Sequence, residues 1–325
     1  MKRVAPTVVL LIILLELTRC DQRNEPYKAA TSFSYQVLPH VTDEAIQIST
    51  TFHLAYVDTR TFLQAKLFVF LGGTGSASQN YLSICKTATS LGYHVINLSY
   101  LNTINGQVCK SQSSSTCFAN YHEEVIFGGT QSDLVKVSAS NSINNRILKL
   151  LQYLHKLNPN NGWGQFYEGS ELVYSKFVLS GHSQGGGHAA YLAQKYSVDR
   201  VVMFSSPNDY SDAADQPASW CRNDFATEVN RFYSLVHKRD DTFALTKQYA
   251  IWKDMGMLTA IDTSSADSSN YSSFKALITN FQPNPAAKTL PLYHNLTAQD
   301  YALPAGADRK HLKQVWLYLL GNPAR

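Results

Sequence analysis

The sequence is poor in charged residues. Aspartate, glutamate, lysine and arginine make up 16% of its 325 residues, against roughly 25% in typical soluble domains. No basic run and no interleaving of basic with aromatic residues occurs along the chain, although such a pattern marks most nucleic-acid-binding surfaces. A nucleic-acid partner is therefore not expected. The formal net charge is only +4, which is too weak to steer a highly charged substrate.

Long hydrophobic runs are also lacking. The apolar run Val8 to Leu15 is much shorter than the about 20 residues that cross a bilayer. Lys2 and Arg3 precede it and Thr18-Arg19-Cys20 follow it, as in a secretory signal cleaved after Cys20. We therefore expect residues 1–20 to be a signal peptide. Residues 21–325 should form one exported domain without a stable membrane span. A retained anchor is the alternative, and a lipid on Cys20 is less favoured because Arg19 precedes it.

Cysteine is scarce, and its spacing excludes a zinc site. Without Cys20 an even number remains, which in an exported chain predicts disulfides. Cys109 and Cys117 flank a serine-rich loop and form the natural local pair, which leaves Cys85 to pair with Cys221. The cysteine spacings fit no zinc motif and no H-E-x-x-H is present. We expect neither a catalytic metal nor a cofactor.

Short apolar segments alternate with amphipathic ones along most of the chain. Residues 32–37 and 45–57 alternate in polarity like antiparallel edge strands, whereas 66–71 is continuously apolar like a strand buried on both faces. Further strands are expected at 94–99, 176–180, 200–205, 231–237 and 274–279, and helices at 78–91, 142–156, 184–196, 243–255 and 308–320. This order predicts a doubly wound, mostly parallel α/β sheet with helices on both faces. Residues 101–140 lack a period and should form an excursion, or cap, over one end of the sheet.

The strongest chemical motif lies at residues 176–196. The strand-like residues 176–180 lead into Gly181-His182-Ser183-Gln184-Gly185, and a helix-like stretch rich in small residues follows. This is G-x-S-x-G in the strand–turn–helix setting that a nucleophile elbow requires. The glycines allow the tight turn, and the helix directs its free N–H groups at developing negative charge. Ser183 is the expected nucleophile, and a structural glycine-rich turn is the alternative.

From about residue 66 onward the chain resembles the α/β-hydrolase fold of esterases, lipases and related serine hydrolases. The resemblance implies a Ser–acid–His triad in that chain order. It also implies an oxyanion hole made by two backbone N–H groups. One belongs to Gln184, after the serine. The other belongs to a glycine-rich loop after an earlier strand, and Leu71-Gly72-Gly73-Thr74-Gly75 fits, with Thr74 as the donor.

The acid and the base follow from their positions along the chain. Asp241 follows strand 231–237 at the spacing common in this fold, and it is preferred over Asp240, one residue earlier. Asp209, Asp212 and Asp215 are remoter alternatives. For the base, His294 lies in a loop before the last helix and is preferred over His311, which lies within that helix. His182, beside the nucleophile, should be structural.

These assignments predict an exported hydrolase that cleaves a small-molecule or polymer carboxylic ester through an acyl-enzyme. A peptidase or amidase with the same triad is an alternative, because the machinery does not separate esters from amides. A binding protein on the hydrolase fold, without catalysis, is a third hypothesis. The sequence does not identify the acyl chain, the alcohol or the oligomeric state.

Overall fold

The computed structural model describes residues 31–48, 51–258, 263–268, 271 and 273–321. The expected signal peptide, its cleavage site at Cys20 and the following residues up to Ala30 lie outside the described residues. In the described part of the chain, no helix is both long enough and apolar enough to cross a membrane.

A nine-stranded mixed sheet forms the centre of the described domain, in the order β1-β2-β4-β3-β7-β8-β11-β13-β12. From β4 onward neighbouring strands are parallel, whereas β2 is antiparallel to both β1 and β4. The strands are β1 Ser32–Val37, β2 His53–Asp58, β3 Leu67–Leu71, β4 His94–Leu98, β7 Phe177–His182, β8 Arg200–Phe204, β11 Phe232–His237, β12 Thr263–Ser265 and β13 Ala276–Thr279. Two small hairpins, β5 Tyr167–Glu168 with β6 Glu171–Leu172 and β9 Tyr210–Ser211 with β10 Gln216–Pro217, lie outside this sheet.

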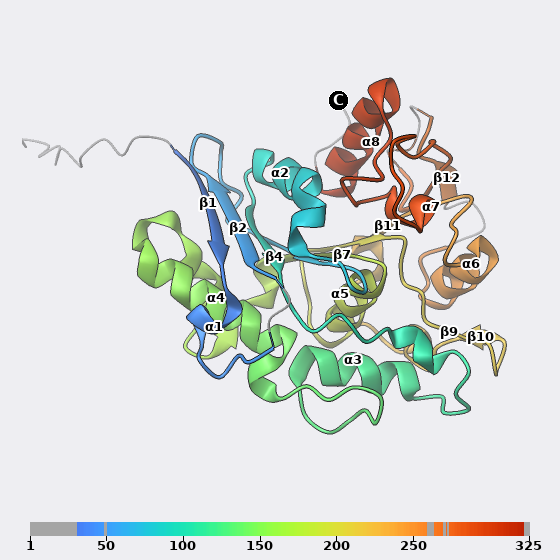
Figure 1. The fold of residues 1–325 in the computed structure, drawn as a ribbon, viewed down its shortest axis with the longest axis horizontal. Coiled ribbons are helices and arrows are strands. Elements are labelled where there is room, and N and C mark those ends of the chain that lie inside the picture. Colours follow the sequence, from blue (N-terminus) through green and yellow to red (C-terminus); the bar gives the residue numbers. More distant parts are fainter. Residues whose placement is uncertain (1–30, 49–50, 259–262, 269–270, 272, 322–325) are drawn as a thin grey trace, which may run out of the picture. The chain divides into compact units, whose positions relative to one another are not determined.

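Helices cover both faces of the sheet (Figure 1). The helices are α1 Pro39–Thr42, α2 Leu82–Ser90, α3 Cys117–Phe127, α4 Ile143–Leu157, α5 Gln184–Lys195, α6 Leu245–Asp254, α7 Leu292–Asn295 and α8 Gly306–Leu319. The apolar side chains of α3, α4, α5 and α6 belong to one buried cluster, and those of α2 and α8 belong to a second. The predicted doubly wound α/β architecture is confirmed.

The fully apolar strands explain why the sheet is buried on both faces. Along β3, Leu67, Val69 and Leu71 belong to the first cluster. Phe68 and Phe70, which alternate with them, belong to the second. Successive side chains of a strand point to opposite faces, so a strand with helices on both sides must be apolar at every position. This rule identified β3 from its sequence.

The antiparallel edge is shorter than its polarity pattern predicts. The expected strand at 45–57 begins only at His53. Ile48, which lies before this strand, is not part of the sheet. Its N–H donates to Asn141 Oδ1 at 2.9 Å and its carbonyl accepts from the buried guanidinium of Arg146. Hydrogen bonds to the α4 side of the molecule therefore replace strand pairing in this segment.

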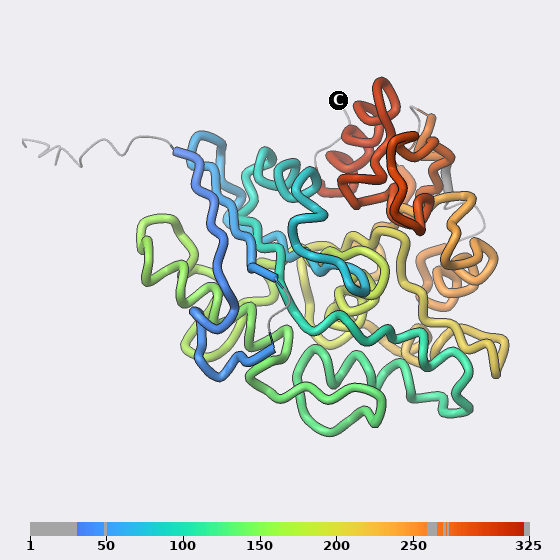
Figure 2. Tube along the Cα trace, viewed as in Figure 1, coloured from blue at the N-terminus to red at the C-terminus, as the bar shows by residue number. Residues whose placement is uncertain are grey.

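The excursion between β4 and α4 contains its own helix and disulfide. After β4 the chain crosses the front of the molecule before turning into α3, as the tube in Figure 2 shows. Cys109 and Cys117 are bonded, as predicted, at a sequence separation of 8. Helix α3 packs on α4 and α5, so the excursion covers the helices on one face as well as one end of the sheet.

The second expected disulfide is wrong. Cys85 and Cys221 are both buried free thiols. Cys85, on α2, belongs to the α2–α8 cluster, whereas Cys221 belongs to the cluster on the opposite face. Because a bridged pair needs Cα atoms within about 7 Å, two cysteines separated by the sheet cannot bond.

Candidate active site

Ser183 lies at the sharp turn between β7 and α5. Its backbone has φ 53° and ψ −123°, a combination that costs energy for any residue other than glycine. Its N–H donates to the Phe204 carbonyl at 2.8 Å. A Cβ at Gly181 would lie 2.3 Å from Gly185 C, and one at Gly185 would lie 2.1 Å from Leu71 O. The elbow therefore needs both glycines, as its motif predicts.

His294 and Asp240 form a buried pair beside this turn. His294 lies on the short helix α7, and Asp240 follows the end of β11. Their side chains are 3% and 6% exposed, and His294 Nδ1 lies 2.8 Å from Asp240 Oδ2. The second nitrogen of the ring, Nε2, is buried and makes no hydrogen bond with a described residue. Nδ1 of the imidazole is thus held by Asp240, while Nε2 can still bond to a ligand.

The hydrogen bonds of Asp240 favour its ionised form. Burial raises the pKa of Asp240, but the bond to His294 and the N–H groups of Phe243 and Thr242 outweigh burial and hold the pKa below its usual value. The two N–H groups reach Oδ1 at 2.9 and 2.8 Å. An ionised carboxylate can only accept, so Nδ1 of His294 carries the proton and Nε2 carries the lone pair.

The structure does not place Asp241, the acid preferred from sequence, against the imidazole ring. Asp241 Oδ2 accepts from Leu292 N at 2.9 Å, and Oδ1 accepts from His294 N at 2.9 Å. Asp241 therefore caps the first turn of α7, while Asp240 contacts the ring. Consecutive residues after a strand point in different directions. A shift of one residue therefore changes which carboxylate faces the ring.

The other candidates from sequence lie away from this pair. His311, on α8, packs its ring against Tyr271 and Phe281. Asp212 pairs with Lys247, and Asp215 accepts from the Tyr210 hydroxyl. Asp209 hydrogen-bonds to a different histidine, described below. Among the aspartates considered, only Asp240 reaches the His294 ring.

His182 anchors the backbone of His294. Burial lowers the pKa of His182 to about 3, helped by the nearby His294 ring. Its neutral Nε2–H donates to the His294 carbonyl at 3.1 Å, and the Ser205 hydroxyl donates to the same oxygen at 2.7 Å. The Tyr81 hydroxyl lies 3.2 Å from Nδ1 of His182. The structural role expected for His182 is therefore found.

The loop after β3 approaches the start of α5. Thr74 Oγ1 donates to Gln184 Oε1 at 2.8 Å, which joins the two predicted oxyanion residues. Gln184 is the first residue of α5, so its N–H has no acceptor within the helix. The Gly73 N–H donates to the Tyr81 hydroxyl, while no described residue is bonded to the Thr74 N–H. The loop itself is held by Asn102, which donates to Gly73 O and Ser76 O, each at 2.8 Å.

Two cavities meet at Ser183. The larger, of about 360 Å³, is lined by Ser183, His294, Thr74 and a set of polar residues. The smaller, of about 40 Å³, is lined by Ser183 and Gln184 but not by His294. Ser183 therefore lies where a wide and a narrow cavity meet.

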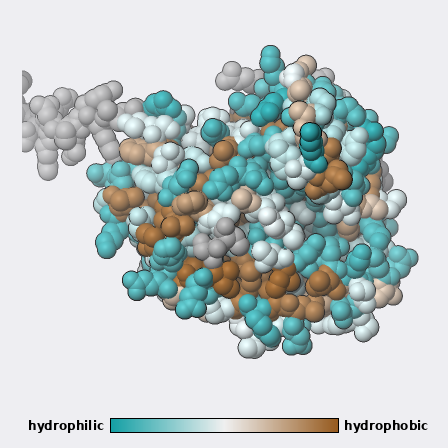
Figure 3. Space-filling view, viewed as in Figure 1, coloured by the Kyte–Doolittle hydropathy of each residue, from teal (hydrophilic) through white to brown (hydrophobic). Residues whose placement is uncertain are grey.

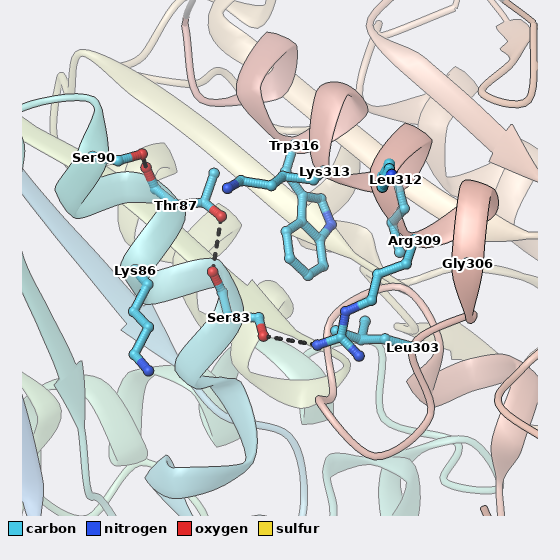
Figure 4. Close-up of a pocket in the computed structure, with 11 residues that line it drawn as sticks. Ser83, Lys86, Thr87, Ser90, Leu303, Gly306, Arg309, Leu312, Lys313 and Trp316 are labelled. Atoms are coloured by element: carbon cyan, nitrogen blue, oxygen red, sulfur yellow. Dashed lines mark hydrogen bonds between the residues drawn. The ribbon is translucent and has the colours of Figure 1, made fainter. Parts of the chain in front are cut away.

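A cavity larger than both of these lies elsewhere in the described chain. It measures about 440 Å³ and lies between α2 and α8 (Figure 4). Its lining includes Lys86, Arg309, Lys310 and Lys313, and Figure 4 shows Trp316 between the two helices. This basic groove contains none of the nucleophile, acid or base candidates, so the volume of a cavity alone does not identify the active site.

The surface around α8 is largely hydrophilic, whereas apolar side chains gather over α3 (Figure 3).

Sequence reasoning missed a polar cluster on the other side of Ser183. Asn208 Nδ2 lies 3.5 Å from Ser183 Oγ. Behind it, Asp209 Oδ2 lies 2.6 Å from His122 Nε2 and accepts from the Trp220 indole at 2.8 Å. His122 Nδ1 in turn lies 2.8 Å from a nitrogen of His188. Asn208 belongs to the segment between β8 and β9, and no sequence motif singles it out.

Trp220 itself is a packing residue. It is 1% exposed, and its indole N–H donates to Asp209 Oδ2. No three His, Cys, Asp or Glu side chains in the described part of the chain are grouped to hold a metal ion.

Comparison with known proteins finds similarity to solved structures only. The sequence matches no protein-family model and no curated protein. MGS-M1, an α/β hydrolase from a Medee basin deep-sea metagenome, has 12% identity and a TM-score of 0.38 over 78% of this chain and 83% of its own. A proposed α/β-superfamily hydrolase from Xanthomonas campestris has 11% identity and a TM-score of 0.39 over 79% and 98%. A proposed dienelactone hydrolase from Klebsiella pneumoniae has 11% identity and a TM-score of 0.42 over 89% and 98%.

These similarities are too distant to assign any residue of this chain, so the residue roles rest on the geometry above. The strand order, with an antiparallel β2 followed by parallel strands, and the elbow between β7 and α5 come from this chain alone. In fold, the chain is a doubly wound α/β protein with a sharp strand–turn–helix at Ser183, which agrees with the fold that its sequence resemblance implies.

Proposed function

We propose that the protein is a serine hydrolase of carboxylic esters, with Ser183 as nucleophile, His294 as general base and Asp240 as the acid that orients it. The observation that carries this proposal is the state of the His294 ring. Its Nδ1 is bonded to a buried carboxylate, its Nε2 makes no hydrogen bond with a described residue, and His294 lines the same cavity as Ser183. A general base needs a lone pair directed at the nucleophile and a partner that stabilises its charged form.

The chemistry follows from these positions. Ser183 Oγ attacks the ester carbonyl carbon and gives its proton to Nε2 of His294. The Thr74 and Gln184 N–H groups stabilise the negative oxygen of the tetrahedral intermediate. His294 then protonates the leaving alcohol, and an acyl-enzyme remains. Water, activated by the same nitrogen, releases the carboxylic acid and restores Ser183. Asp240 stabilises the imidazolium that forms in each half-reaction.

Two further parts of the proposal concern location and substrate type. Residues 1–20 are proposed to direct export, which the Cys109–Cys117 disulfide supports, since such bonds persist in oxidising compartments. The same triad can cleave amides, so a panel of matched esters and anilides distinguishes an esterase from an amidase.

Hydrolysis of p-nitrophenyl acetate by the wild type and Ser183→Ala tests the proposal. We expect loss of about 10³-fold or more in kcat, with circular dichroism unchanged. His311→Ala is the matched control, because its ring packs away from the site, and it should retain wild-type kcat. Activity retained in Ser183→Ala would refute the mechanism.

A further inference from the structure

The two cavities at Ser183 differ in size and in their relation to the base. The wide one, of about 360 Å³, includes His294, whereas the narrow one, of about 40 Å³, includes Ser183 and Gln184 without it. Under the proposed mechanism, this difference assigns the two halves of an ester. We propose that the substrate is a short acyl ester, of acetyl size, of a neutral polyhydroxylated alcohol such as a sugar. This inference rests on the proposed function.

The assignment of the two cavities follows from the proton that His294 delivers. The leaving oxygen must lie within hydrogen-bond reach of Nε2 when it is protonated, so the alcohol occupies the cavity that His294 lines. The carbonyl oxygen points at the N–H groups of Thr74 and Gln184. The acyl substituent takes the remaining direction from the carbonyl carbon, away from His294. That direction leads into the narrow cavity.

The narrow cavity limits the length of the acyl chain. Its volume of about 40 Å³ is about one ninth of the about 360 Å³ of the wide cavity. A methyl group fits such a space, whereas a chain of several methylenes does not. The lining includes Tyr121, His122, Asp209 and Phe243, each of which is less than 9% exposed.

The back wall of this cavity is braced. His122 is held at both ring nitrogens, 2.6 Å from Asp209 Oδ2 and 2.8 Å from His188 Nδ1. The Trp220 indole fixes the same carboxylate oxygen at 2.8 Å, and the His122 ring stacks on Tyr191. A wall held by this many buried hydrogen bonds resists displacement by a longer chain, because moving one member would leave buried polar groups unpaired. The buried cluster around His122 and Asp209 would thereby limit the length of the acyl chain.

Apart from Leu290 and Pro291, the wide cavity is lined by polar residues and glycine, and none of its described lining residues is lysine, arginine, aspartate or glutamate. Its side chains are mainly amides and hydroxyls, which both donate and accept hydrogen bonds as sugar hydroxyls do. They include Thr74, Ser76, Asn80, Asn105, Thr242, Thr289, Asn295, Gln299 and Tyr301. A cationic or anionic alcohol would find no counter-charge here. The groove between α2 and α8, in contrast, is lined by Lys86, Arg309, Lys310 and Lys313 (Figure 4).

The side-chain amide of Asn80 is placed to form a hydrogen bond with the alcohol. Its backbone N–H and carbonyl are bonded to Ala77 O and Asp300 N. No hydrogen bond joins its side-chain amide to another described residue, and it lines the wide cavity. Removing this amide should therefore weaken binding of the alcohol without disturbing the chain around it.

The acyl side is tested with p-nitrophenyl acetate, butyrate and octanoate. We expect kcat/KM to fall at least about 10-fold from acetate to butyrate, and further to octanoate, since a methylene that does not fit costs roughly 10-fold or more. Phe243→Ala enlarges the narrow cavity and keeps the backbone N–H that bonds to Asp240. It should raise the butyrate-to-acetate ratio at least about 10-fold. Phe62→Ala, at a side chain that is 89% exposed, should leave the ratio unchanged.

The alcohol side is tested with glucose pentaacetate against acetylcholine, both at wild type and in Asn80→Ala. We expect the neutral sugar ester to be preferred. Asn80→Ala should lower its kcat/KM about 10-fold, the size of one lost hydrogen bond. Asn230→Ala, at a surface amide bonded to Glu228, is the matched control.

The outcomes separate this inference from the proposed function. Octanoate hydrolysed as fast as acetate, or acetylcholine as fast as the sugar acetate, would overturn the substrate assignment while leaving the Ser183 mechanism intact. Should Phe243→Ala fail to fold, the wild-type chain-length profile still decides the acyl side. No hydrolysis of any ester by folded protein, with Ser183 unreactive, would instead refute the proposed function itself.

Discussion

Asp240 and Asp241 hold the same histidine by different atoms. Asp240 Oδ2 lies 2.8 Å from the ring nitrogen Nδ1 of His294, while Asp241 Oδ1 accepts from the main-chain N–H of His294 at 2.9 Å. One carboxylate contacts the ring, and the other caps the helix that carries it. Neighbouring residues of equal charge thus have separable roles.

This difference predicts unequal effects of the same substitution. Asp240→Asn should lower kcat by about 10⁴-fold, because the amide favours the wrong tautomer and cannot stabilise the imidazolium. Asp241→Asn should change kcat less than about 10-fold, because its amide oxygen can still cap α7. Steady-state kinetics on p-nitrophenyl acetate measure both variants. The reverse order of effects would mean that Asp241 is the acid.

The close packing around the elbow predicts a severe effect of one methyl group. Gly185→Ala places a Cβ 2.1 Å from the Leu71 carbonyl oxygen, so β3 and α5 would have to separate. We expect a loss of more than about 4 kcal/mol in the free energy of unfolding, or failure to fold. Gly169→Ala is the control, because Gly169 has φ +59° but no atom within 4 Å of the added Cβ. That variant should lose only about 1–2 kcal/mol, as measured by urea denaturation.

Buried neutral histidines predict a loss of stability in acid. Burial, together with the smaller effect of the charge of Arg146, lowers the pKa of His53 from 6.5 to about 3. The unfolded chain therefore binds a proton near pH 6.5 that the folded chain does not bind until about pH 3. The stabilisation is present above pH 6.5 and is lost as the pH falls towards 3. His182 adds a second group with the same sign and a pKa of about 3.

His53→Asn tests this account. Its amide oxygen can replace Nδ1 of His53 as acceptor for the Ser99 N–H, yet it does not titrate. Below pH 6, the slope of unfolding free energy against pH should become shallower by up to about 1.4 kcal/mol per pH unit. An unchanged slope would show that His53 is not protonated on acid unfolding.

The cysteines predict a definite thiol count. Residues 21–325, denatured without reductant, should release two reactive thiols, from Cys85 and Cys221, and four after reduction. In the folded protein both thiols should be inert, because burial raises the pKa of each. Cys109→Ser/Cys117→Ser should cost about 2–3 kcal/mol, as loop-entropy arguments give for a short loop. No free thiols in the denatured, unreduced protein would contradict the observed pairing.

The features that sequence predicted are those with a local cause. The Gly181-to-Gly185 motif determines its own turn, since the contacts that exclude Cβ atoms arise from the turn and the strand next to it. The apolar strand β3 needs no information beyond its own composition. Cys109 and Cys117 were paired correctly because they are close in the chain.

The features that sequence misjudged depend on how distant segments are oriented. Whether Asp240 or Asp241 faces the ring depends on where the chain turns after β11. The pairing of Cys85 with Cys221 failed because nothing in their spacing reveals that the sheet separates them. Asn208 carries no motif at all, and only the packing of its loop brings its amide to 3.5 Å from Ser183 Oγ.

The most direct test of the account is labelling by a fluorophosphonate, followed by mapping of the modified peptide. The wild type should carry the adduct on Ser183, and His294→Ala should react at least about 100-fold more slowly, since the serine loses its base. His311→Ala should react at the wild-type rate. A folded protein that takes up no label, or takes it up on Ser183 equally fast in His294→Ala, would contradict a Ser183–His294 catalytic pair.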